Sequence, residues 1–184
     1  MTTIEEYKAM TTPAPATDDP AAIERADLLD LLTKHRFFLR TTVAGLDDEA
    51  ATKRTTVSEL TLGGLVKHVA FVERGWAEFI RRGPAAMEMT EESYAAHGNS
   101  FRLLPGETLA GVLADYAEVA AQTDALLAEV DLNSSHPLPE APWFPPGARW
   151  TARRVITHIV AETAQHAGHA DIIRESLDGQ KTMG

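Results

Sequence analysis

The residues most suited to chemistry in this 184-residue chain cluster near its end, in the segment THIVAETAQHAGHAD. It contains His158, Glu162, His166 and His169. At about 100° per residue, these four side chains project within an arc of about 80° on one helix. Apolar residues flank this stripe, so we expect it to face the core. A buried glutamate costs several kcal/mol unless it has a partner, so we expect positive charge beside Glu162.

A further histidine, His68, lies in the segment GGLVKHVAFVERGW, on the apolar face of another expected helix. Glu162 and His166 are four residues apart, about one helical turn, which suits adjacent positions around a metal ion. With His68 they would supply three ligands to one divalent ion and leave positions open for water or substrate. The alternative is a hydrogen-bonded polar network in the core that holds no metal.

The remaining histidines have less definite roles. His158 is interpreted as a fourth ligand, a hydrogen-bond donor to a ligand, or a packed residue, and these alternatives stay open. His169 is the candidate catalytic residue, as a proton acceptor or substrate contact, with packing beside a ligand as the alternative. We expect His35, His97 and His136 on the surface or in loops.

Other residues are candidates for the surroundings of the site. Glu73 and Arg174 either approach it or form ordinary ion pairs. Trp143 and Phe144, with Trp150, either cover an open end of the protein or cap its core.

Helical periodicity dominates the chain and predicts the elements that position these residues. Asp19-Pro20 is typical of a helix start, and Thr61 can cap a second helix. The apolar spacing predicts long helices over about 21–43, 62–82, 107–130 and 152–177. A short helical turn is expected over 91–96, and the five prolines of 131–149 predict a loop. With no strand expected, the fold class is all-α, an antiparallel four-helix bundle.

Composition narrows the class of protein. We expect a loose arm over residues 1–18 and one domain over 19–184. The absence of cysteine excludes disulfides, cysteine-bound metals and a protein thiol nucleophile. The 17 basic and 27 acidic residues give a net charge of −10, which opposes binding to nucleic acid. No apolar run is long enough for a membrane span and no signal peptide is evident, so we predict a cytoplasmic protein.

The stretches TLGGLVKHVAFVERGW and WTARRVITHIVAETAQHAGHADIIRESLDG resemble the DinB/YfiT-like superfamily of metal-binding four-helix bundles. The resemblance covers about residues 24–179 and is strongest to an uncharacterised actinobacterial branch related to mycothiol-dependent maleylpyruvate isomerases. It implies a divalent metal, most often zinc or nickel. By position it implies His68, Glu162 and His166 as ligands and leaves out His158.

Three functions follow as hypotheses. The first is a metal-dependent enzyme that transfers a low-molecular-weight thiol, such as mycothiol, to a small electrophile. The second is a hydrolase that uses metal-bound water. The third is a bundle that binds metal or ligand without catalysis. The expected partners are a small-molecule substrate, a small thiol and a second copy of the chain in a homodimer.

Overall fold

The computed structural model describes residues 18–88 and 90–182. The predicted arm over residues 1–18 lies, except for Asp18, outside the described residues. The helices are α2 (Pro20–Thr41), α3 (Asp48–Thr52), α4 (Leu62–Arg82), α5 (Glu91–Ser100), α6 (Leu109–Glu129) and α7 (Ala152–Asp178), with a 3-10 turn η1 (Gly83–Ala86). The strands are β1 (Ser135–Pro137) and β2 (Arg149–Thr151). The described chain is therefore mostly helical, as the periodicity predicts.

The long helices begin at residues whose side chains accept hydrogen bonds from the first helical turn. Asp19 accepts from the amide of Ala21, and Pro20 follows it. Thr61 and Thr151 cap α4 and α7 in the same way. Such caps satisfy amide groups that have no partner inside the helix. These signals are local, and therefore the helix starts agree closely with the sequence prediction.

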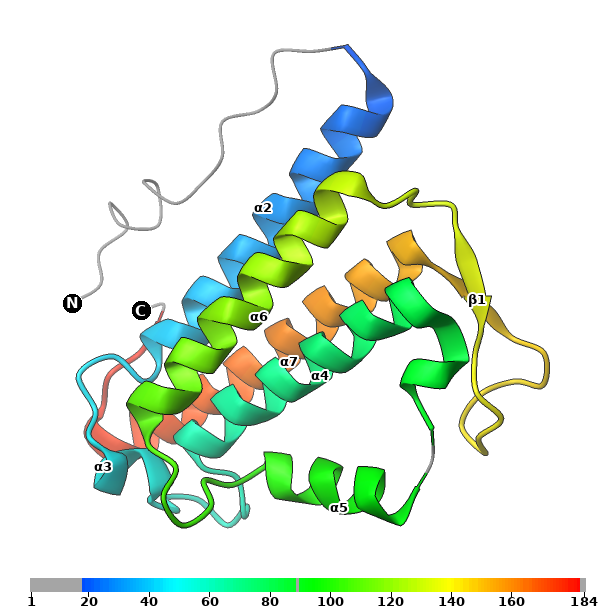
Figure 1. Ribbon diagram of the computed structural model, residues 1–184. Helices are drawn as coiled ribbons and strands as arrows, with labels where there is room; N and C mark the ends of the chain where they lie inside the picture. Colours follow the sequence, from blue (N-terminus) through cyan, green and yellow to red (C-terminus); the bar gives the residue numbers. More distant parts are fainter. Residues whose placement is uncertain (1–17, 89, 183–184) are drawn as a thin grey trace.

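The helices α2, α4, α6 and α7 run side by side, and contacts between their side chains define their directions (Figure 1). Contacts join Lys67 to Glu107 and Arg74 to Asp115, so α4 and α6 run in the same direction. Arg153 contacts Glu24, near the beginnings of α7 and α2.

At the other end of these two helices, Arg174 of α7 donates to the carbonyl of Thr42, which follows α2, so α2 and α7 are also parallel. The helices α4 and α7 run in opposite directions, because His68 contacts His166 and Trp76 contacts His158.

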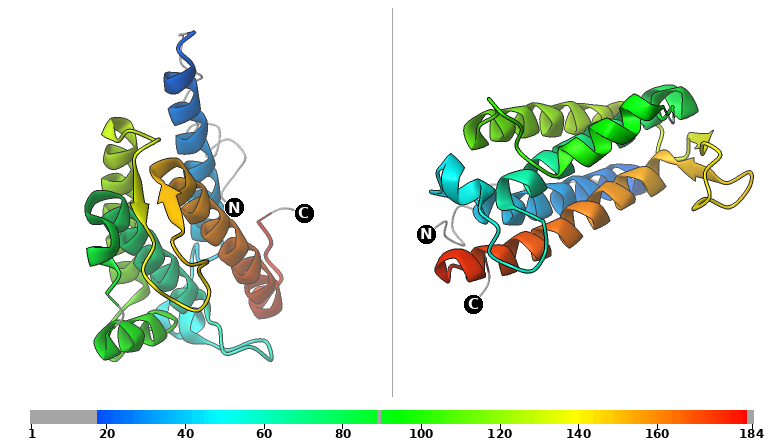
Figure 2. Two further views of the ribbon diagram at one scale, coloured as in Figure 1. Left: turned by 90° about the vertical axis from the view of Figure 1, so that its right-hand side faces the viewer. Right: turned by 90° about the horizontal axis from the view of Figure 1, so that it is seen from below.

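This arrangement differs from the predicted antiparallel bundle in one respect. The long helices α4 and α6 follow each other in the chain but run in the same direction. The reason is α5, which carries the chain back along α4 before α6 begins (Figure 1). In Figure 2, α5 and the β1–β2 hairpin lie outside the four long helices. Long crossover connections of this kind occur in some helical bundles.

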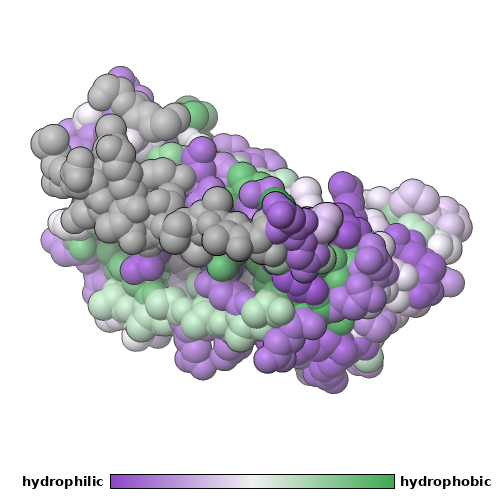
Figure 3. Space-filling model, turned by 90° about the horizontal axis from the view of Figure 1, so that it is seen from above, coloured by the Kyte–Doolittle hydropathy of each residue, from purple (hydrophilic) through white to green (hydrophobic). Residues whose placement is uncertain are grey.

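The buried apolar residues form two clusters along the long helices. One contains Leu39, Leu65 and Tyr116, and the other contains Phe79 and Ile156. Strongly hydrophobic residues appear in small separate groups on the face drawn in Figure 3, between hydrophilic ones. No described helix is both long and apolar enough to cross a membrane.

Two local predictions are confirmed only in part. The segment 131–149 is predicted to be a loop, but Ser135–Pro137 within it pairs antiparallel with Arg149–Thr151, and His136 lies opposite Trp150. The helical turn expected over 91–96 extends to Ser100. A capping box formed by Thr90 and Ser93 starts that helix, and the buried Ser100 ends it against α4.

Candidate metal centre

The antiparallel packing of α4 and α7 brings together His68, Glu162 and His166. One ligand atom from each residue lies within 4.8 Å of the others. His68 and His166 are 3% and 8% exposed, whereas the Glu162 side chain is 29% exposed. Two imidazole nitrogens and a carboxylate oxygen are a donor set that zinc and other divalent transition metals accept. The structure thus places the three predicted ligands in one group at the edge of the core.

A chain of hydrogen bonds determines which ring nitrogen of His68 carries its proton. Nδ1 of His68 lies 2.8 Å from Oγ of Ser100, and that hydroxyl donates to the carbonyl of His97 at 2.6 Å. Because a serine hydroxyl has only one proton to give, Oγ must accept from Nδ1 of His68. Nε2 therefore keeps its lone pair, as a metal ligand requires.

The His68 ring is also held from the side by the segment that follows α5. Phe101 stacks on it, with ring centroids 3.7 Å apart and planes inclined by 19°. This segment approaches α4 closely at Gly64, where a Cβ atom would overlap the Phe101 carbonyl oxygen. Glycine at this position thus lets α5 dock against α4 beside His68.

Glu162 lies between two histidines of its own helix. Its carboxylate oxygens are 3.6 Å from Nε2 of His158 and 3.7 Å from Nε2 of His166. Nδ1 of His166 lies 3.5 Å from Nδ1 of His169. A proton shared between those two Nδ1 atoms leaves Nε2 of His166 free to face the same point as His68.

The electrostatics favour the neutral form of three of these imidazoles, those of His68, His158 and His166. Burial, followed by the nearby His166 and His97, lowers the pKa of His68 to about 3. Burial also lowers the pKa of His158 and of His166, although Glu162 acts in the opposite direction on both. Neutral imidazoles are the form that binds metal.

A pocket of about 410 Å³ opens beside the centre. His68 and Glu162 line it, together with His158, whose ring meets Trp76 and Trp150 edge-on at 4.9 and 5.1 Å. His158 thus lies in a pocket wall, in contact with Glu162 and with aromatic rings. A substrate in this pocket would reach His68 and Glu162 directly.

The predicted cover of the site is present in part. Trp143 and Phe144 line the pocket, and Trp150 packs against Phe144 and Trp76. The aromatic loop therefore contributes to the pocket, while Trp150 supports it from behind.

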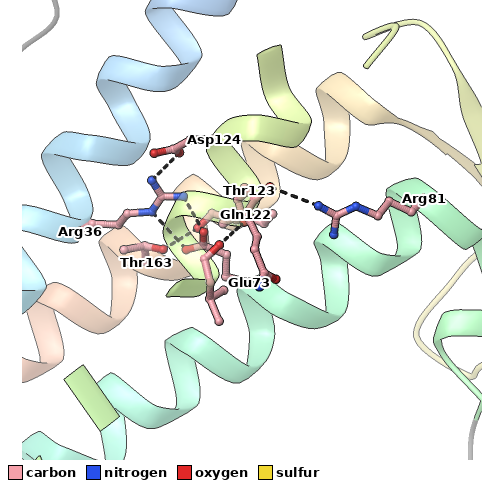
Figure 4. A network of polar contacts seen from close by, with 9 residues as sticks. Arg36, Glu73, Arg81, Gln122, Thr123, Asp124 and Thr163 are labelled. Atoms are coloured by element: carbon pink, nitrogen blue, oxygen red, sulfur yellow. Dashed lines mark hydrogen bonds and ion pairs between the residues drawn. The ribbon is translucent and has the colours of Figure 1, made fainter. Parts of the chain in front are cut away.

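Glu73 and Arg174 do not join the centre. Glu73 is fully buried and pairs with Arg36 of α2, which also contacts Asp124 of α6 (Figure 4). Arg174 is buried, not a surface residue, and contacts Asp178 and the carbonyls after α2. Both belong to separate polar clusters because their side chains leave α4 and α7 on other faces.

The histidines expected on the surface or in loops have different positions. His35 is half-buried on α2. His136 is half-buried in β1, and its Nε2 lies 3.1 Å from the Ile80 carbonyl. His97 is exposed, as expected, but lies on a helix, with its ring centroid 5.5 Å from that of His68.

Sequence reasoning missed Ser100 and Phe101, which hold His68. The capping box at Thr90 and Ser93 indicates that a helix starts there. No local signal indicates that this helix ends against α4.

A sequence model described as mycothiol-S-transferase matches residues 27–179. No protein of curated function matches the chain.

Proposed function

Because the chain belongs to the mycothiol-S-transferase family, we propose that it transfers a low-molecular-weight thiol of the mycothiol type to a small electrophile. The reaction takes place at a divalent metal, zinc or nickel, held by His68, Glu162 and His166. The match covers most of the chain and includes both helices that carry the proposed ligands.

The observation that carries the proposal is the preset tautomer of His68. The Ser100 hydroxyl donates its hydrogen bond to the carbonyl of His97 and accepts one from Nδ1 of His68, so Nε2 of His68 keeps its lone pair beside Glu162 and His166. Hydrogen bonds that orient ligand histidines in this way are typical of metal sites. A polar network without metal would instead pair these acceptors with donors.

The bound metal would supply the positive charge that stabilises a thiol as its thiolate. The chain's own residues supply the rest. Glu162 contributes the one negative charge among the three ligands. His169 is proposed to handle a proton, because its Nδ1 lies beside Nδ1 of His166. The aromatic residues that line the pocket would contact the electrophile.

The finer structural and cellular predictions belong with this proposal. We propose that the four long helices form a four-helix bundle of the DinB/YfiT type and that residues 19–184 are one domain. We also propose that the protein acts in the cytoplasm as a homodimer.

The first test is metal analysis of protein purified without a histidine tag. We expect about one zinc or nickel ion per chain, lost after dialysis against a strong chelator. His68→Ala and His166→Ala should each lower the metal content sharply. His35→Ala removes a half-buried histidine of α2 that belongs neither to the three proposed ligands nor to the pocket lining, so it is the matched control and should keep the metal.

The second test follows thiol consumption with a model electrophile. The metal-loaded protein should accelerate conjugation, and the chelated protein should leave it at the background rate. Equal rates with and without metal would contradict the proposal. Turnover of activated esters without any thiol would favour the hydrolase instead.

A further inference from the structure

The pocket beside the metal centre has an unusually aromatic mouth. Tyr94 of α5 and Trp143 of the loop before β2 both line it, although they are 56% and 60% exposed. They come from segments far apart in sequence, and Trp76 and Phe144 extend the same wall inward. Exposed aromatic side chains that converge on one hollow mark a surface built to bind apolar groups.

The charged side chains in the described lining of this pocket are acidic. Its described lining contains the carboxylates of Glu88 and Glu162 and three histidines, but neither lysine nor arginine. The nearby Arg154 lies over the ring of Trp150, 4.8 Å from its centroid, and is not part of the lining. Away from the proposed metal, a carboxylate or phosphate on the electrophile would find no cationic side chain in the described lining and would meet Glu88.

A second cavity, of about 600 Å³, does not change this conclusion. It lies between α4, α5 and α6, and its cations Lys67 and Arg74 are paired with Glu107 and Asp115. None of the three proposed metal ligands lines it. An electrophile bound there would be separated from the centre.

We infer that the electrophile accepted by this pocket is an uncharged, planar aromatic compound. Tyr94 and Trp143 select its ring by stacking, and Glu88 disfavours anionic analogues. This inference rests on the proposed thiol transfer for its chemistry, but the binding preference itself does not depend on turnover.

The reaction is a substitution at the ring of such a compound. With a chlorodinitrobenzene, the sulfur of the thiol forms a bond to the ring carbon that carries chlorine. The carbon–chlorine bond then breaks, and chloride leaves with the bonding electron pair. The proton of the thiol passes to the buffer by way of His169, in the role proposed for it above.

The first arm of the experiment measures binding without reaction, by equilibrium dialysis of chelator-treated protein, so that the carboxylate of a probe cannot bind the metal. The probes are a dinitrotoluene and the corresponding ring-methylated dinitrobenzoate anion, which carries one additional carboxylate on the ring. We expect the uncharged compound to bind at least about tenfold more tightly, which corresponds to about 1.4 kcal/mol. Equal affinities, or tighter binding of the benzoate, would overturn the inference.

The variants assign the preference to named residues. Trp143→Ala should weaken binding of the dinitrotoluene about two- to tenfold, and Trp143→Phe should restore most of it. Glu88→Gln should improve binding of the benzoate and leave the dinitrotoluene unchanged. Ile172→Ala removes an equally exposed apolar side chain outside the pocket and should change neither. If Trp143→Ala and Ile172→Ala behave alike, the stacking role is wrong.

The second arm compares conjugation of a thiol to the chlorodinitrobenzene and to its carboxylated analogue, each relative to its uncatalysed rate. A higher kcat/KM for the uncharged compound supports the inference. Equal values with clear catalysis overturn it while thiol transfer stands. No catalysis of either, with the binding preference intact, contradicts the proposed function and supports the assignment of the pocket.

Discussion

Two polar clusters lie within five residues of each other along α4, and they differ in how their charges are satisfied. At Glu73, Arg36 donates to both carboxylate oxygens, at 3.2 and 2.5 Å, and also contacts Asp124 at 2.7 Å. At His68, the facing groups are Glu162 and His166, and the nearest nitrogens to the Glu162 oxygens are 3.6 and 3.7 Å away. In the first cluster, the arginine satisfies the carboxylate by direct hydrogen bonds. In the second, the potential ligand atoms of three residues lie close together without such a partner.

The electrostatics of the two clusters reflect this difference. Burial alone lowers the pKa of Arg36, but Glu73 and Asp124 outweigh it and raise that pKa above its ordinary value. At His68, burial acts together with neighbouring histidines, and the pKa falls. A buried ion pair thus stabilises its own charges, while the histidine cluster stays neutral and can accept a cation. The comparison teaches that a buried polar cluster can satisfy its own charges, as at Glu73, or leave acceptors that could bind a cation, as at His68.

The largest effect should come from breaking the closed cluster. Glu73→Ala leaves Arg36 buried without its main partner, and we expect the free energy of unfolding to fall by about 3–5 kcal/mol. Urea unfolding of chelator-treated protein measures this loss without any contribution from metal. The double variant Arg36→Met/Glu73→Leu should recover most of the stability. If it is as unstable as the single variant, the cluster matters for more than its charges.

A smaller effect should follow from disturbing the open cluster without removing a ligand. Ser100→Ala removes the acceptor that orients Nδ1 of His68, and we expect metal affinity to fall about 10- to 100-fold. Competition with a chelating dye measures that affinity.

Ser93→Ala is the control for this second variant, because it weakens the cap of α5 but leaves the contact of His68 in place. A similar loss of affinity in both variants would assign the effect to α5 as a whole. Unchanged affinity in Ser100→Ala would remove the tautomer argument.

The smallest effect concerns a third polar pair, in which the arginine is buried and the carboxylate is partly exposed. Arg174 and Asp178 have side chains that are 4% and 34% exposed. The hydrogen bond from Arg174 lowers the pKa of Asp178 in the folded protein. Its stabilisation is therefore present above the pKa of the unfolded carboxyl, about 4, and is lost as pH falls through the lowered folded value.

Asp178→Asn should accordingly cost less than about 1 kcal/mol near neutral pH and almost nothing in strong acid. Thermal unfolding of both proteins across this pH range measures the difference. Glu175→Gln, which alters an exposed pair with Lys181, should show little change. A cost for Asp178→Asn that persists in strong acid would contradict the ionic origin of the effect.

Prediction from the sequence succeeded where the signals are local. Asp19-Pro20 and Thr61, predicted as helix starts, are hydrogen-bonding caps in the structure, and each start depends on residues within one turn. The same helical period places Glu162 and His166 on one stripe. It could not assign partners to Glu73 or Arg174, because an inward position on a helix does not specify which neighbouring helix it meets.

The amino-acid sequence by itself determined the helical class, the helix starts and the residues that could form a metal centre. Only the tertiary structure decided that α5 returns the chain beside α4, that Ser100 and Phe101 hold His68, and that Glu73 belongs to Arg36. The physical reason is the separation along the chain between the residues that interact. Helix formation and capping depend on neighbours three or four residues away, whereas these pairings join residues more than thirty positions apart in the chain.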